Sequence, residues 1–193
     1  MARIASLCVY CGSSPGARPA YQQAAQELGT QLGERGIELI YGGGGIGLMG
    51  LVADAALTAG GRVTGVIPGH LDELEVGHDG VRMEVVPSMH ARKQRMFELA
   101  DAFVALPGGA GTLDESIEII TWRQLHLHDK PLAMIDIEGY WGPFQALMRH
   151  VVEQEFAGPA MSDLYFMVAS VAALWPALEA APEPRLTAEA HLL

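Results

Sequence analysis

Short apolar runs alternate along this chain with longer stretches of helical periodicity, and that alternation restricts the folds that it can adopt. The apolar runs lack a polar residue at every second position, which is typical of parallel strands covered on both faces. Alternation of such strands with helices indicates a doubly wound α/β fold. We therefore predict one Rossmann-like domain over residues 1–180, with a mostly parallel sheet and helices on both of its faces.

The apolar and periodic segments give the bounds of the expected elements. The predicted strands are Ile4–Tyr10, Ile37–Tyr41, Arg62–Ile67, Met83–Val86, Ala102–Leu106, Leu132–Ile135 and Tyr165–Val168. The predicted helices are Pro19–Arg35, Gly47–Ala59, Ser88–Leu99, Thr112–His126, Gly142–Glu155 and Val171–Ala180. Residues 181–193 combine Pro and Ala with few charges, and we expect a flexible C-terminal tail there.

Composition limits the classes of function. The 193 residues fit a single domain, and their 50% hydrophobic content supplies a sizeable core with a surplus for a subunit interface. The net charge of −11 argues against DNA or RNA as a partner, because phosphate backbones need basic surfaces. No apolar stretch is long enough to span a bilayer, and the N-terminus lacks the order of a signal peptide. We expect a soluble cytoplasmic protein with no membrane partner.

The stretch LPGGAGTLDE, residues 106–115, joins a predicted strand to a predicted helix through a glycine turn. Glycines allow several backbone N–H groups to point at one spot, and a helix N-terminus adds partial positive charge there. Glu115 stands one turn further along the helix. A phosphate-binding site beside a carboxylate indicates chemistry on a sugar phosphate or a nucleotide.

Glu115 also has a purely structural interpretation. Thr112 and Glu115 have the T-x-x-E spacing of a capping box, in which the glutamate accepts the N-cap amide. Glutamine completes a capping box as well, so Glu115→Gln should leave folding nearly unchanged. If Glu115 carries chemistry, the same substitution should abolish turnover.

A second glycine-rich segment, Gly42–Gly45, leads into the G-x-G-x-x-G pattern of residues 45–50. A dinucleotide site would also need an acidic residue at the end of the next strand, and that strand ends in Ile67 and Pro68. The pattern therefore disfavours a dehydrogenase. Four consecutive glycines still indicate that something approaches the backbone closely.

The segment Gly12–Gly16 matches the G-x-S-x-G pattern of a hydrolase nucleophile elbow. That elbow uses the N–H after the serine as an oxyanion donor, and the residue after Ser14 is Pro15, which has no N–H. A nucleophilic Ser14 is therefore disfavoured. A turn whose hydroxyls and amides contact an anion is the better interpretation, with Ser13 or Ser14 as a phosphate contact.

A basic segment follows Pro87, with Ser88 as a plausible helix N-cap. Met89, Arg92 and Met96 fall on one helical stripe, which combines apolar surface with a guanidinium. A solvated basic face remains the simpler alternative. The concentration of cations in so acidic a protein favours contact with a flat, partly apolar ligand such as a purine nucleotide.

Several other candidate sites have weak support. Cys8 and Cys11 form a C-x-x-C pattern, but side chains alternate along a strand, so we expect buried thiols rather than a redox pair. His126 and His128 show no metal spacing with a third ligand, and we expect them to complement a helix C-terminus. We predict no metal and no cofactor.

Four segments together resemble the LONELY GUY (LOG) family, whose members are often mislabelled lysine decarboxylases. These segments are CGSS (residues 11–14), YGGGG-x-x-GLMG (41–50), MH-x-RK (89–93) and PGG-x-GT-x-x-E (107–115). The resemblance spans about residues 4–168. It implies a homodimeric phosphoribohydrolase that needs no metal or pyridoxal phosphate. Such an enzyme cleaves N6-substituted adenosine 5′-monophosphates, the cytokinin riboside monophosphates, and in some members AMP, into free base and ribose 5-phosphate.

The resemblance also assigns roles to residues. Arg92 and Glu115 would form the catalytic pair, and Met89 and Lys93 would border the base and the ribose. The phosphate would be bound by Gly108, Gly109, Gly111 and Thr112, with Ser13, Gly43, Gly44 and Gly45 nearby. The span Leu71–Asp79 carries the least diagnostic contacts. The alternative is a protein that binds and carries a nucleotide-like cofactor without cleaving it, for which the Arg92–Glu115 pair is unnecessary.

Overall fold

The computed structural model of the protein describes residues 4–69, 80–182, 184 and 186. The span Leu71–Asp79 and most of the expected C-terminal tail lie outside the described residues. No helix in the described part of the chain is long and apolar enough to cross a membrane.

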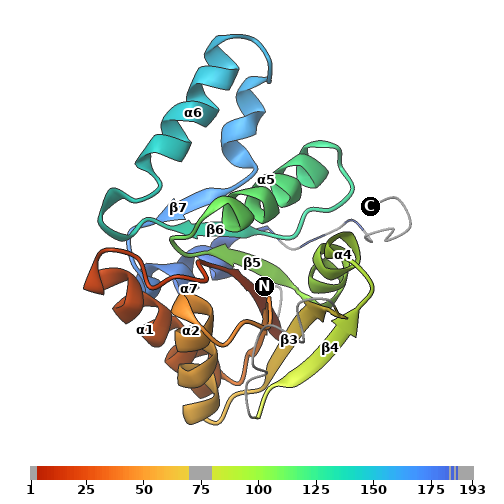
Figure 1. The fold of residues 1–193 in the computed structure, drawn as a ribbon. Coiled ribbons are helices and arrows are strands. Elements are labelled where there is room, and N and C mark those ends of the chain that lie inside the picture. The colour runs from red at the N-terminus through yellow and green to blue at the C-terminus, as the bar shows by residue number, and fades with distance from the viewer. Residues whose placement is uncertain (1–3, 70–79, 183, 185, 187–193) are drawn as a thin grey trace.

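The described strands form one seven-stranded sheet in the order β4-β3-β2-β1-β5-β6-β7, and every neighbouring pair is parallel. The predicted α/β class with a mostly parallel sheet is thus confirmed (Figure 1). The strands are β1 (Ser6–Tyr10), β2 (Glu38–Tyr41), β3 (Val63–Pro68), β4 (Arg82–Val86), β5 (Ala102–Ala105), β6 (Leu132–Ile135) and β7 (Phe166–Val168).

Helices cover both faces of the sheet (Figure 1). One face packs against α1 (Pro19–Arg35), α2 (Gly47–Thr58) and α7 (Val171–Ala180). The other packs against α4 (Met89–Leu99), α5 (Ala110–Gln124) and α6 (Gly142–Glu153). Two short 3₁₀ helices, η1 (Ile137–Gly139) and η2 (Pro159–Asp163), flank α6.

The two faces of the sheet separate the two cysteines. Cys8 belongs to the core cluster under α4, α5 and α6, whereas Cys11 belongs to the cluster under α1, α2 and α7. Both are buried free thiols, and burial raises the pKa of each well above its ordinary value. The expectation that both cysteines are buried is confirmed.

Two local expectations are wrong. Helix α5 begins at Ala110 rather than Thr112, and Gly109 is its N-cap without any side-chain capping bond, so Thr112 and Glu115 form no capping box. The glycine turn enters the helix two residues earlier than the side-chain pattern suggests, because a Gly N-cap is tolerated almost as well as a polar one. His128 lies beyond the end of α5, where burial lowers its pKa to about 4, so it is uncharged at neutral pH and complements no helix dipole.

Strand order creates a crevice at the carboxyl edge of the sheet. From β1 the chain winds outward through β2 and β3 to β4, and then returns to place β5 on the other side of β1. The loops after β1 and β5 therefore diverge, and ligands of doubly wound sheets bind at such a switch point. The glycine-rich segments that follow β1, β2 and β5 all open onto this edge.

Close packing of α1 on α2 depends on a glycine. A Cβ added at Gly29 would lie 2.3 Å from the carbonyl oxygen of Val52, which belongs to the α2 backbone. Helix propensity favours Ala over Gly by about 1 kcal/mol, but a backbone clash at this distance must separate the two helices.

We expect Gly29→Ala to lower the free energy of unfolding by about 1–3 kcal/mol, because overpacking outweighs helix propensity. Chemical denaturation measures this change. Gly142→Ala is the control, since Gly142 is also helical, at the start of α6, but its added Cβ would meet nothing within 4 Å. Equal stability of the two variants would contradict the packing argument.

Candidate functional site

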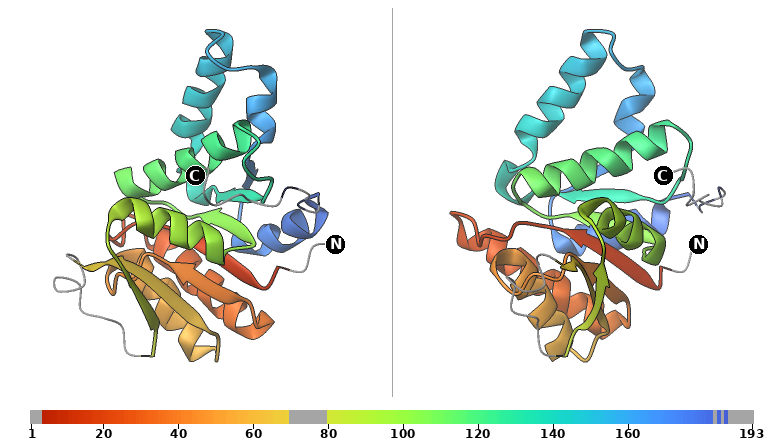
Figure 2. Two further views of the ribbon diagram at one scale, coloured as in Figure 1. Left: turned by 90° about the vertical axis from the view of Figure 1, so that its right-hand side faces the viewer. Right: turned by 45° about the vertical axis from the view of Figure 1, so that its right-hand side comes forward.

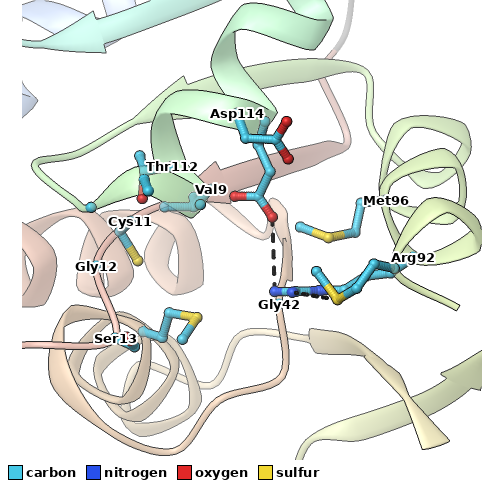
Figure 3. Close-up of a pocket in the computed structure, with 15 residues that line it drawn as sticks. Val9, Cys11, Gly12, Ser13, Gly42, Arg92, Met96, Thr112 and Asp114 are labelled. Carbon is cyan, nitrogen blue, oxygen red and sulfur yellow. Dashed lines mark hydrogen bonds and ion pairs between the residues drawn. The ribbon is translucent and has the colours of Figure 1, made fainter. Parts of the chain in front are cut away.

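A cavity of about 270 Å³ opens at the carboxyl ends of β1, β2 and β5, between α4 and the N-terminus of α5 (Figure 3). Its wall combines backbone from the glycine-rich turns, three methionine side chains and one buried pair of opposite charges. The residues that line it are Val9, Cys11, Gly12, Ser13, Gly42, Met49, Met89, Arg92, Met96, Gly109, Ala110, Gly111, Thr112, Asp114 and Glu115.

The first turn of α5 forms one wall of the cavity. Gly109 is the N-cap, and Gly109, Ala110, Gly111 and Thr112 all line the space. The first N–H groups of a helix have no partner within the helix, and the helix dipole adds positive charge at that end. This wall is therefore suited to an anion such as a phosphate group.

Thr112 in that wall is packed against Gly108 behind it. The Thr112 side chain is buried, and a Cβ added at Gly108 would lie 2.1 Å from its Oγ1 atom. Ser116 donates a hydrogen bond of 2.7 Å from its hydroxyl to the Thr112 carbonyl. Only glycine fits at position 108, so the turn and the helix start hold one arrangement.

Arg92 enters the cavity from α4. Ser88 caps this helix by accepting a bond of 3.1 Å from the Ala91 N–H, as the sequence predicts. The Arg92 side chain crosses the opening and ends at Gly42 (Figure 3), where an added Cβ would lie 1.9 Å from Nη2. The close approach that the glycine run indicates is thus made, at Gly42, by an arginine of the protein itself.

Arg92 and Glu115 form an incomplete ion pair inside the cavity. Arg92 Nη2 lies 3.8 Å from Glu115 Oε1, and the two side chains are only 13% and 11% exposed. The Arg92 Nε atom is buried without a hydrogen-bond partner. Because Nη2 and Oε1 stand too far apart for a short hydrogen bond, both keep hydrogen-bonding capacity that a ligand can use.

Burial raises the pKa of Glu115 from 4.5 to about 7, and the charge of Arg92 opposes that rise only in part. Asp114 raises this pKa further, whereas Lys93 lowers it. A carboxyl group that titrates near neutrality in a cavity beside a buried cation is typical of a functional site. It can exchange a proton with a ligand at physiological pH.

Lys93 and Arg95 lie on α4 outside the cavity wall. Lys93 Nζ pairs with Glu118 at 2.9 Å and with Asp114 at 3.2 Å, both on α5. Arg95 pairs with Glu84 at 2.6 Å and with Glu98 at 3.2 Å. Of the basic segment, only the predicted Met89–Arg92–Met96 stripe faces the cavity.

The structure brings seven of the expected site residues together around the cavity. They are Ser13, Met89, Arg92, Gly109, Gly111, Thr112 and Glu115. Gly108 and Lys93 stand behind the lining, and Gly43, Gly44 and Gly45 belong to the adjoining turn before α2. Gly43 has a positive φ of 81°, which explains a glycine there by backbone conformation.

The sequence did not assign Asp114 or Met49 to the site, although each lies next to a residue or in a segment that it did single out. It marked Gly42 only as part of a glycine run that something approaches closely. Cys11 and Gly12 carry part of the first matched segment, and both line the cavity. The motifs identified the segments that form the site, but they did not show which side chains of those segments point into the cavity. The described residues contain no group of three or more His, Cys, Asp or Glu side chains that could hold a metal ion.

Fold and cavity define an α/β protein with a small-ligand site at the switch point of a parallel sheet. The family model described as "Possible lysine decarboxylase" matches residues 49–178. The cytokinin riboside 5′-monophosphate phosphoribohydrolase LOG of Oryza sativa subsp. japonica is 49% identical over 155 residues, which are 80% of this chain and 64% of that protein. The LOG1 enzyme of the same description from Arabidopsis thaliana is 44% identical over 174 residues, or 90% of this chain and 82% of that protein.

The chain belongs to this family of LOG proteins, as its motifs predict. It spans 64% of the length of the two rice relatives that it matches at 48% and 49% identity. Among solved structures, the Moco carrier protein of Chlamydomonas reinhardtii has a TM-score of 0.68 at 23% identity, over 92% of this chain and 96% of that one. The molybdenum cofactor binding protein of Rippkaea orientalis has a TM-score of 0.67 at 20% identity, with the same shares of 92% and 96%. These two structures share the fold.

The raised pKa of Glu115 makes folding stability depend on pH. The stabilising effect of the protonated carboxyl is fully present below pH 4.5 and is lost as the pH rises through about 7. Glu115→Gln removes this dependence. We expect the variant to gain stability relative to the wild type, by on the order of 3 kcal/mol between pH 4.5 and pH 8. Urea unfolding at the two pH values measures it, and a constant difference would show that Glu115 titrates normally.

Proposed function

We propose that this chain hydrolyses the N-glycosidic bond of adenosine 5′-monophosphates that carry an N6 substituent, releasing the free base and ribose 5-phosphate. One observation carries the proposal: the cavity joins an anion-binding helix start to a buried Arg92–Glu115 pair. A phosphate at the first turn of α5 would be anchored on one side of the cavity. The ribose would then lie against the carboxylate in the second turn of the same helix.

Glu115 suits the cleavage step. As the bond between C1′ and the purine nitrogen breaks, positive charge develops on the ribose ring, and an adjacent carboxylate lowers the energy of that state. Water adds its oxygen to C1′ and gives up a proton to Glu115, while the purine leaves with the electron pair of the broken bond and takes up a proton from solvent; Glu115 then returns its proton to solvent. A carboxyl group with a pKa of about 7 can accept and return that proton near neutral pH.

Arg92 suits a role at the leaving base. An arginine stays protonated in proteins, so it assists by charge and hydrogen bonding rather than by giving up a proton. Its buried Nε has no partner in the protein, and its end is held against Gly42. Met89 and Met96 flank it on α4 and offer apolar surface to a purine. Binding of the phosphate supplies the orientation of the ribose, since remote contacts position the reacting atoms.

Two other functions fit less well. The fold is shared with molybdenum cofactor carriers, but a carrier has no need of a carboxyl group that titrates near neutrality beside a buried arginine. A pyridoxal-dependent decarboxylase needs a free lysine amine. Lys93 is paired with Asp114 and Glu118, and Lys130 donates a hydrogen bond of 2.8 Å to the Phe97 carbonyl.

The proposal includes a homodimer and a cytoplasmic location. Apolar side chains stay exposed on α5 and on α6, which extends away from the rest of the molecule (Figure 2): Leu113 and Ile117 on α5 and Leu147 on α6. Phe156, which follows α6, is 86% exposed. Burial of these groups against a second copy would explain them, and Leu113 lies next to the cavity residues. Free thiols at Cys8 and Cys11 suit a reducing compartment.

Incubation with isopentenyladenosine 5′-monophosphate or AMP, followed by chromatography of the free base, tests the function. We expect release of base by the wild type and a loss of at least about 100-fold in kcat for Glu115→Gln. Glu98→Gln makes the same chemical change on α4 outside the cavity and should keep full activity. Tight binding of the nucleotide without any base release would favour a carrier. Equal turnover of the nucleoside and its monophosphate would contradict phosphate anchoring.

The rate should depend on pH through Glu115. We expect kcat/KM to rise with pH along an acid limb centred near pH 7, because the ionised carboxylate is the active form. Asp114→Asn removes a charge that raises the pKa of Glu115 and should move this limb to lower pH. Lys93→Met removes a charge that lowers that pKa and should move the limb to higher pH. Shifts in the same direction would assign the limb to another group.

A further inference from the structure

Tyr140 lies outside the cavity wall, yet its side-chain hydroxyl contacts the backbone of the glycine turn that leads into the anion-binding helix start. It lies between η1 and α6, on the loop after β6, and its hydroxyl donates a short hydrogen bond to the Gly108 carbonyl. Nothing in the sequence marks this contact, because 32 residues separate the two partners.

The position of the bond matters because peptide groups are planar and trans. The Gly108 carbonyl and the Gly109 N–H belong to one peptide group and point in opposite directions. By holding the carbonyl outward, the Tyr140 hydroxyl sets the direction of the Gly109 N–H. Gly109 is the N-cap of α5 and lines the cavity.

The preceding peptide group is held in the same manner. The Gly12 N–H donates a bond of 3.1 Å to the Pro107 carbonyl, which sets the direction of the Gly108 N–H. Gly109 itself has open space where a Cβ would stand, so side-chain packing does not restrain this residue. Hydrogen bonds to the two carbonyls, from Gly12 and Tyr140, therefore fix the entrance to the helix.

Tyr140 is held in place by its own surroundings. Its ring makes edge contacts with Tyr21, at 5.6 Å between centroids, and with Trp141, at 5.0 Å. The loop that carries it is closed by a bond of 2.7 Å from the Trp141 N–H to Asp136 Oδ1. An ion pair of 2.9 Å joins Glu138 on this loop to Arg18 at the start of α1.

We propose that Tyr140 is a positioning residue for phosphate, which orients the N–H groups at the start of α5 through the Gly108 carbonyl. This inference rests on the proposed function for the identity of the anion. It adds the loop after β6 to the site, although no residue of that loop lines the cavity. If the Tyr140 hydroxyl were purely structural, its removal would lower only the stability of the fold. If it positions phosphate, its removal must weaken binding of ligands that carry a phosphate and leave binding of ligands without one unchanged.

Tyr140→Phe tests the inference, with calorimetric binding of ribose 5-phosphate as the first readout. We expect the Kd to rise about three- to tenfold, the effect of one hydrogen bond. The ratio of kcat/KM for isopentenyladenosine 5′-monophosphate to that for isopentenyladenosine should fall by the same factor. Tyr165→Phe is the control, because it removes a hydroxyl from a buried tyrosine that packs against α6 and lies outside the cavity wall.

Binding and turnover separate this inference from the proposed function. If the wild type releases no base but Tyr140→Phe still weakens ribose 5-phosphate binding, the enzymatic proposal fails and the role of Tyr140 stands. An unchanged Kd and an unchanged ratio would overturn the role of Tyr140, whatever the activity. Should Tyr140→Phe lose its fold, Asp136→Ala decides, because it removes the hydrogen bond to the Trp141 N–H that closes the loop. Release of the loop should weaken ribose 5-phosphate binding about twofold or more, and no change would overturn the inference.

Discussion

A buried arginine that reaches its carboxylate only across 3.8 Å is the interaction on which the site depends. Two opposite charges in a poorly solvated cavity attract strongly, but each also loses the stabilisation of water. Here the pair is too far apart for a short hydrogen bond, so the attraction between the two charges offsets only part of their lost solvation. Glu115 accordingly keeps a pKa of about 7 despite the nearby guanidinium.

That separation is maintained by backbone rather than by side chains. Gly42 leaves the space into which the end of Arg92 extends, and a side chain there would collide with Nη2. Glu115 is fixed by its place in the second turn of α5, whose start is bound by Gly108 and Thr112. Both charges are therefore preorganised by rigid elements before any ligand enters, which is the arrangement that favours electrostatic stabilisation of a developing charge.

Sequence and structure agree closely on the elements and less closely on the site. The apolar runs located all seven described strands to within two residues. For the inner strands the reason is that a strand covered on both faces must be largely apolar, whereas the edge strand β4 is half exposed and carries Arg82 and Glu84. Helix α5 shows where local patterns mislead: Thr112 and Glu115 have capping-box spacing, yet the helix already starts at Ala110. A threonine and a glutamate three residues apart also occur on the surface inside a helix. The pattern alone therefore could not distinguish a helix N-cap from a position within the first turns.

Some residues around the cavity could be recognised from the sequence and others could not. Chemistry-bearing side chains in motifs, such as Arg92 and Glu115, were visible in the sequence because few other structural roles explain them. Gly42 was visible as a requirement for close approach, but the approaching group was not, since Arg92 is 50 residues away in the chain. Tyr140 gave no signal at all, because a tyrosine after a buried strand has many ordinary uses.

The amino-acid order by itself determined the class of fold, the family and the two ends of the site, the anion-binding turn and the charged helix stripe. It did so because hydrophobic periodicity and backbone conformation are local properties, which neighbouring residues largely control. Only the tertiary structure decided the distance between Arg92 and Glu115, the burial that moves a carboxyl pKa to about 7, and the contact of Tyr140 with Gly108. Those quantities depend on which strands become neighbours in the sheet, and strand order is a property of the whole folded chain.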